Sequence, residues 1–220
     1  MSLKAIIFDM DGVVIDSEKL YDITLDTFFT KRWIPYIRES MKPMYMGKSA
    51  KEASTLQKEL YNLPESIDEL TAEKRATLSD LIEKELEFIP GFLEYFSFIK
   101  SKWLQYSIAT GTGDVMFIKK DAKLGIKKLF DNNIVTVDQV WWIGKPDPTL
   151  FLTAAKMIWC TPDECLVIED ALFGIQAAHR AHIPVIWFTS TLSESQIASE
   201  NPTYIAHSYD EIRKITEELL

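Results

Sequence analysis

The 220-residue sequence has few cysteines and no long apolar run. Its two cysteines, Cys160 and Cys165, have a spacing that suits neither a paired zinc knuckle nor a disulfide framework, so we expect reduced thiols. No stretch approaches the roughly 18 consecutive apolar residues of a membrane-spanning helix, and the N-terminus lacks the pattern of a secretion signal. These absences predict a cytoplasmic protein that does not bind membranes.

Positive charge and glycine are also scarce. The chain has 24 Lys and Arg against 33 Asp and Glu, a net charge of −9, which argues against a nucleic-acid partner but allows a local basic pocket for a phosphorylated small molecule. With 8 glycines, 9 prolines and 47% apolar residues, the sequence is not disordered or collagen-like. Its length fits one well-cored domain plus a smaller module.

Short, almost wholly apolar runs recur along the chain, as expected of parallel strands buried on both faces. These runs are residues 4–9, 105–110, 133–137, 165–169 and 184–188. Helix-like stretches lie between and around them, at 92–102, 114–124, 149–158 and 172–181. The alternation predicts an α/β fold, a doubly wound parallel sheet with helices on both faces.

The segment 16–87 breaks this alternation. Leu20, Thr24 and Phe28 recur at helical spacing, and Ser66 with Glu69 has the form of a capping box that opens a further helix. We therefore expect a helical domain at 16–87, inserted into a core domain that is built from 1–15 and 88–220.

Polar groups follow four of the predicted strands at their carboxyl ends, where open parallel sheets bind ligands. They are Asp9 and Asp11 after the first strand, Thr110 and Gly111 after the second, Lys145 after the third, and Glu169 and Asp170 at the end of the fourth. Each group alone is a weak signal, whereas their order and placement together predict one site.

Asp9 and Asp11 can divide the work of a phosphoryl transfer. A carboxylate can attack phosphorus to form an aspartyl-phosphate, which is the role that we assign to Asp9. Asp11 would protonate the leaving oxygen and then take a proton from the attacking water. Taken alone, however, Asp11-Gly12 is also an ordinary turn with a solvated acid.

The remaining groups would neutralise and hold the phosphoryl group. Mg²⁺ prefers oxygen ligands, which Asp9, the Asp11 carbonyl, Glu169 and Asp170 could supply. Alternatively, Glu169 and Asp170 could be acids that stabilise a helix N-terminus.

Lys145 could pair with Asp9 and the phosphoryl group, or it could be a solvated turn residue. Thr110 and the Gly111 N–H could bind phosphoryl oxygens, or they could cap a helix without a ligand.

With all four groups in order, the chain resembles the haloacid dehalogenase-like hydrolase superfamily, in particular the subgroup of β-phosphoglucomutase and small sugar-phosphate phosphatases. The matching motifs are Asp9-Met10-Asp11-Gly12, Thr110-Gly111, Gly144-Lys145-Pro146 and the 169–174 segment EDALFG. The resemblance implies a Rossmann-like core with an α-helical cap and a site that binds Mg²⁺. The matched positions would carry the nucleophile, the acid/base, the phosphoryl contacts, the lysine and the metal ligands.

The cap of this chain departs from the mutase pattern. Mutases of the subgroup place a histidine where this chain has Tyr21, and an arginine where it has Ala50. The cap's substrate loop resembles the segment around Gly47, in which Lys48 or Lys51 could hold a distal anionic group.

The sequence therefore predicts an Mg²⁺-dependent phosphatase that acts on a small phosphorylated metabolite, a sugar phosphate, through an aspartyl-phosphate. The alternatives are a phosphosugar mutase and a phosphate-binding or phosphoacceptor protein with little turnover. We expect a monomer or weak homo-oligomer, with a small phosphate ester as its only class of partner.

Overall fold

The computed structural model describes residues 2–45, 49–189 and 200–220. The chain divides into two compact units, one formed by Met1–Asp16 with Glu87–Leu220 and the other by Ser17–Leu86. We call the first the core unit and the second the helical unit, and each is described by itself.

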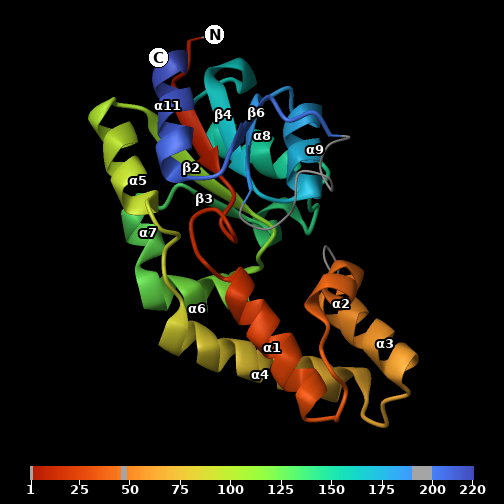
Figure 1. The fold of residues 1–220 in the computed structure, drawn as a ribbon. Helices are drawn as coiled ribbons and strands as arrows, with labels where there is room; N and C mark the ends of the chain where they lie inside the picture. The colour runs from red at the N-terminus through yellow and green to blue at the C-terminus, as the bar shows by residue number, and fades with distance from the viewer. Residues whose placement is uncertain (1, 46–48, 190–199) are drawn as a thin grey trace. The chain divides into compact units, whose positions relative to one another are not determined.

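The core unit is built on a parallel sheet, which confirms the predicted fold class (Figure 1). The strands of the described residues are β1 (Ala5–Phe8), β2 (Gln105–Thr110), β3 (Ile134–Thr136), β4 (Cys165–Glu169), β5 (Val185–Phe188) and β6 (Tyr204–Ala206). Their order across the sheet is β3-β2-β1-β4-β5-β6. β1 therefore lies in the middle, between the strands that carry Thr110 and Glu169.

Helices cover both faces of this sheet. They are α5 (Phe92–Ser101), α6 (Asp114–Leu124), α7 (Ile126–Leu129), α8 (Thr149–Met157), α9 (Leu172–Arg180) and α11 (Tyr209–Leu219), with short 3-10 turns at Val137–Val140 and Pro162–Glu164. In Figure 1, α5 and α11 lie on one side of the sheet and α8 and α9 on the other.

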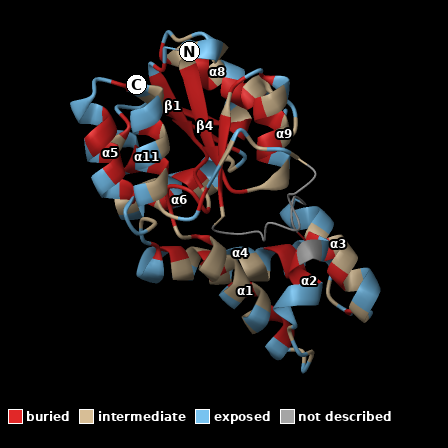
Figure 2. Ribbon diagram, turned by 45° about the horizontal axis from the view of Figure 1, so that its top comes forward, coloured by how far each residue is buried: buried red, intermediate tan, exposed pale blue. Residues whose placement is uncertain are grey.

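The alternation of side chains along β1 explains the two layers. Ala5 and Ile7 join the core beneath α8 and α9, which includes Phe151. Phe8 points to the opposite face, where its ring meets that of Phe92 of α5 edge-on at 5.8 Å between centroids. Strands β1, β3, β4 and β5 are buried along their whole length, as Figure 2 shows for β1 and β4. This burial gives the ends of the strands a rigid base.

The helical unit contains α1 (Glu18–Thr30), α2 (Arg38–Tyr45), α3 (Ala50–Tyr61) and α4 (Ile67–Glu85). The capping box predicted at Ser66 is confirmed, because the Ser66 hydroxyl accepts from the Glu69 N–H and the Glu69 side chain accepts from the Ser66 N–H. The apolar stripe of α1 reaches a small core that contains Phe28, Phe29 and Leu70. In the described part of the chain, no helix is long and apolar enough to cross a membrane.

Candidate active site

The end of β1 delivers Asp9 to the centre of the sheet's carboxyl edge. Phe8 pairs with Ile108 of β2 and Ile168 of β4, so the residue that follows it lies beside the ends of both neighbours. The Asp9 N–H still donates to the Ile168 carbonyl at 2.9 Å, which continues the ladder as far as the carboxylate. The sheet register itself therefore places Asp9 beside Glu169.

A tight loop follows Asp9 and turns the chain back on itself. The N–H groups of Val14 and Ile15 both donate to the Met10 carbonyl, and the Gly12 N–H donates to the Ile15 carbonyl at 2.9 Å. Gly12 has φ of 79°, a conformation that favours glycine. Because Met10, Val13 and Val14 are fully buried, apolar packing fixes the loop that carries Asp11.

Lys145 lies between two carboxylates. Its Nζ donates to Asp9 Oδ1 and, at 2.7 Å, to Glu169 Oε1. The side chains are only 10% exposed for Lys145 and 2% for Glu169. A buried ammonium is costly unless it is paired, so this geometry ties the loop after β3 to the ends of β1 and β4.

The pKa values of Asp9 and Lys145 are both raised. Burial raises the pKa of Asp9, and the negative charges of Glu169 and Asp11 add to this, while Lys145 opposes it. Burial acts to lower the pKa of Lys145, but the carboxylates of Asp9 and Glu169 outweigh it and raise that pKa. The carboxylates therefore favour the charged form of Lys145, and a further positive charge beside Asp9 would lower the pKa of that carboxyl.

Three buried carboxylates gather at this edge of the sheet. One oxygen each from Asp9, Glu169 and Asp170 lie within 4.8 Å of one another. Glu169 is also fixed by the Ala171 N–H, which donates to its Oε2 at 2.6 Å. Such a cluster of hard oxygen donors can hold a divalent cation.

The end of β2 brings hydroxyl and backbone donors to the same edge. Thr110 is buried, and its hydroxyl accepts from the Thr112 N–H at 3.0 Å. Gly111 is exposed in the turn that leads into α6, and a side-chain carbon there would meet no atom within 4 Å. The turn therefore leaves room for a ligand at the Gly111 backbone.

Two residues that the sequence analysis did not select contact Asp11. Thr112 Oγ1 donates to Asp11 Oδ2 at 2.6 Å, and Lys120 Nζ donates to Asp11 Oδ1. Lys120 was detectable in principle, because it lies one helical turn after buried Phe117 and therefore on the apolar face of α6. A lysine at such a position indicates a buried partner.

The residues predicted to contact substrate from the helical segment belong to the helical unit. Tyr21 is half-buried on α1, and Lys51 is exposed in the first turn of α3. Gly47 and Lys48 lie outside the described residues. Their roles remain predictions.

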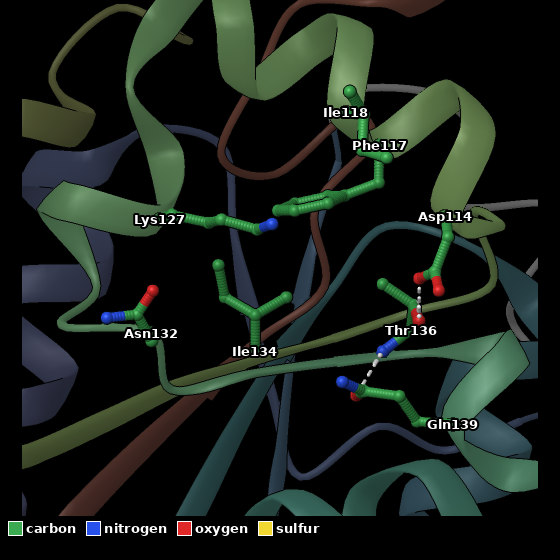
Figure 3. Close-up of a pocket in the computed structure, with 8 residues that line it drawn as sticks. All are labelled: Asp114, Phe117, Ile118, Lys127, Asn132, Ile134, Thr136 and Gln139. Atoms are coloured by element: carbon green, nitrogen blue, oxygen red, sulfur yellow. Dashed lines mark hydrogen bonds between the residues drawn. The ribbon is translucent and has the colours of Figure 1, made fainter.

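A pocket of about 300 Å³ lies at the β3 edge of the core unit (Figure 3). Thr136 Oγ1 donates to the Asp114 carboxylate at 2.6 Å, and the Thr136 N–H donates to the Gln139 side chain at 3.1 Å. None of the clustered acids lines it. Because these lining groups bind one another, we assign the chemistry to the acidic cluster at the strand ends instead.

The fold and the cluster define a Rossmann-like α/β protein with a nucleophile candidate at the end of the central strand. The sequence profile of the haloacid dehalogenase-like hydrolases matches residues 6–188, and the chain belongs to this family. The predicted resemblance is thereby confirmed.

The chain is similar to named enzymes of the family over most of its length. A phosphorylated carbohydrates phosphatase of Thermotoga maritima is 29% identical over 99% of this chain and 100% of its own. A (DL)-glycerol-3-phosphatase of Arabidopsis thaliana is 30% identical over 84% of this chain and 63% of its own. A conserved haloacid dehalogenase-like protein of Agrobacterium tumefaciens has the same fold, with a TM-score of 0.84, 22% identity and 99% coverage of both chains. The chain is thus a hydrolase, and both of these enzyme relatives are named as phosphatases.

Proposed function

We propose that the protein is an Mg²⁺-dependent phosphatase of a small phosphorylated metabolite, a sugar phosphate, that works through an aspartyl-phosphate on Asp9. The observation that carries the proposal is the buried Asp9 carboxylate, paired with Lys145 and adjacent to Glu169 and Asp170. A relative that aligns with 99% of the chain is named as a phosphatase of phosphorylated carbohydrates, which supports the substrate class.

The acidic cluster suits the proposed cation. Three buried carboxylates repel one another, and burial raises the pKa of Asp9, so a bound cation would relieve both penalties. Asp9, Asp170, the Asp11 carbonyl and Glu169 would hold Mg²⁺, directly or through water. When bound, Mg²⁺ would supply positive charge against the phosphoryl oxygens.

In the first half-reaction, a carboxylate oxygen of Asp9 forms a bond to phosphorus while the bond from phosphorus to the leaving oxygen breaks. Asp11 gives its proton to that leaving oxygen, so the product departs as a neutral alcohol. Lys145, the Thr110 hydroxyl and the Gly111 N–H hold the phosphoryl oxygens during the transfer.

In the second half-reaction, Asp11 takes a proton from a water molecule as the water oxygen attacks phosphorus. The bond between phosphorus and Asp9 then breaks, which releases inorganic phosphate and restores the Asp9 carboxylate. Asp11 is again protonated and ready for the next substrate. One carboxyl group thus serves as acid and as base in turn.

The helical unit, Ser17–Leu86, is proposed to act as a cap over the substrate. A cap excludes water while the phosphoryl group is transferred and admits it afterwards. Tyr21, Gly47, Lys48 and Lys51 are the residues from which we expect contacts to the rest of the substrate. Lysine would bind a distal anionic group as a point charge.

The experiment is phosphate release from a panel of sugar phosphates and other phosphorylated metabolites, with and without Mg²⁺, using Asp9→Asn as the blank. We expect Mg²⁺-dependent release that Asp9→Asn abolishes. Interconversion of hexose phosphates without net release would instead identify a mutase. A stable phospho-adduct without turnover would identify a phosphoacceptor.

A further inference from the structure

Lys120 is a buried charge in the core unit that the mechanism above does not use. It projects from α6, its side chain is 1% exposed, and its Nζ donates to Asp11 Oδ1. Removing an ammonium from water is costly unless a carboxylate compensates for it. The contact with Asp11 therefore compensates for the burial of the Lys120 ammonium.

Thr112, two residues before α6 begins, contacts the same carboxylate. Its hydroxyl donates to the other carboxylate oxygen, Asp11 Oδ2, at 2.6 Å, and Lys120 Nζ lies 3.4 Å from that hydroxyl. Donors on both oxygens fix the plane of a carboxylate as well as its position. Each carboxylate oxygen has two acceptor positions, so these bonds are compatible with proton transfer at the same group.

We propose that Lys120, together with Thr112, is a positioning residue that holds the Asp11 carboxyl in the orientation required for proton transfer. This inference rests on the proposed phosphatase function. Lys120 acts through Asp11, without contact to the reacting phosphoryl group. Proton transfer requires a donor within hydrogen-bond reach of the leaving oxygen, so an Asp11 that turns freely spends little time in the productive orientation.

The proposal predicts a dependence on the leaving group. An alkyl phosphate needs a proton on its leaving oxygen, whereas p-nitrophenyl phosphate releases a stable phenolate without one. The ratio kcat/KM reports the steps up to formation of the aspartyl-phosphate, since the leaving group departs there. Loss of Asp11 positioning should therefore lower kcat/KM for the alkyl ester more than for the aryl ester.

The experiment compares Lys120→Met and Thr112→Val with the parent enzyme on p-nitrophenyl phosphate and on the fastest sugar phosphate of the panel. For Lys120→Met we expect kcat/KM to fall about tenfold or more on the sugar phosphate and less than about threefold on the aryl ester. KM should stay near its original value. Lys119→Met removes the same charge from an exposed position of α6 and should leave both values unchanged.

Other outcomes have distinct meanings. Equal losses on both substrates, or none on either, would overturn the positioning role. If Lys120→Met does not fold, Thr112→Val decides the matter by the same ratio, with a smaller expected effect. If the parent hydrolyses nothing, the proposed function fails first and the positioning role falls with it.

A second, independent inference concerns the tryptophans. Trp33, Trp103 and Trp159 have φ between 57° and 60° and are 96%, 89% and 94% exposed. Trp141 and Trp142 share the left-handed conformation and are also exposed. Bulky side chains seldom adopt this conformation, and tryptophan is usually buried in large part. Five tryptophans combine both exceptions.

Backbone hydrogen bonds show which type of helix end three of these tryptophans occupy. After α5, the Trp103 N–H donates to the Lys100 carbonyl and the Leu104 N–H donates to the Ile99 carbonyl. The same pair of bonds occurs at Trp33 after α1 and at Trp159 after α8. This is the Schellman motif, whose left-handed residue is most often glycine.

The remaining tryptophan is also poorly suited to its position. Trp187 lies on β5 and is 1% exposed. Within the described residues its indole N–H has no hydrogen-bond partner. The chain has 6 tryptophans and only 8 glycines, about half of the usual glycine share.

We infer that these tryptophans, above all Trp33, Trp103 and Trp159, occupy glycine positions, and that the source cell reads their codon as glycine. Peptide masses of the protein isolated from that cell should show glycine at 33, 103 and 159, and tryptophan there would overturn the inference. In the recombinant chain, changing Trp33, Trp103 and Trp159 together to glycine should raise Tm by about 5 °C or more. The matched triple change to alanine keeps the unfavourable Cβ and should raise it less. An equal or greater rise with alanine would contradict the glycine assignment.

Discussion

The carboxylate of Glu169 occupies the space that a Cβ on Gly174 would fill. A carbon built at Gly174 would overlap both Oε1 and Cδ of Glu169. Gly174 lies in the first turn of α9, where the helix passes directly over the end of β4. The missing side chain is therefore what allows Glu169 to reach Lys145.

Gly174→Ala should consequently disrupt the site by displacing Glu169. Alanine favours a helix by about 1 kcal/mol over glycine, but here its Cβ must displace the Glu169 carboxylate. We expect kcat to fall at least about tenfold, measured by phosphate release. Gly144→Ala is the matched control, because a Cβ there meets no atom within 4 Å. Unchanged turnover in Gly174→Ala would show that the position of Glu169 does not matter.

Removal of Mg²⁺ with EDTA should abolish phosphate release, and added Mg²⁺ should restore it. Asp170→Asn removes one negative charge from the three-carboxylate cluster, so it should raise the Mg²⁺ concentration needed for half-maximal rate by about tenfold or more. A titration of rate against Mg²⁺ measures this. Full activity in EDTA would exclude a cation from the mechanism.

The lowered pKa of Lys74 in the helical unit predicts a pH dependence of stability. Burial, assisted by the charge of Arg32, lowers its pKa to about 8. Between that pH and the ordinary lysine pKa, the unfolded chain binds more protons than the folded one. The contribution of Lys74 to the free energy of unfolding therefore rises with pH in this range. Denaturant unfolding of the parent and Lys74→Met across this range should show a steeper rise in the parent. Parallel curves would contradict the shifted pKa.

Arg32 should be a main stabiliser of the helical unit. It donates to Glu65 at 2.7 Å and to Glu73 at 2.6 Å, and its guanidinium lies 4.0 Å from the centroid of the Phe28 ring. Arg32→Met should lower the free energy of unfolding by about 2–3 kcal/mol, since it leaves two part-buried acids without this partner. Lys84→Met, which breaks an exposed pair with Asp80, should cost about 0.5 kcal/mol or less. Equal costs in urea titrations would refute the distinction.

Much of the core unit followed from local patterns. The apolar runs located β1 to β5 because these strands are buried on both faces. β6 was missed because it is a short edge strand with Ile205 exposed, so it leaves no continuous apolar signal. Parallel strands end at one edge of a sheet, which is why sequence order alone brought Asp9 and Glu169 together.

The finer geometry required coordinates. Lys120 is far from Asp11 along the chain, and only the packing of α6 brings its ammonium to that carboxylate. The close approach of Glu169 to Gly174 likewise depends on the angle between β4 and α9. Periodicity identifies which face of a helix is buried, but it does not identify the partner of a polar group on that face.

The central claim, a covalent phosphate on Asp9, can be tested by trapping it. Enzyme mixed with substrate and Mg²⁺ is quenched in acid within milliseconds, reduced with borohydride and digested, because borohydride converts an aspartyl-phosphate into homoserine. Peptide mass spectrometry should find homoserine at position 9 in the parent and none in Asp9→Asn. If phosphate is released but no modified Asp9 peptide forms, water attacks the substrate directly and the account is wrong.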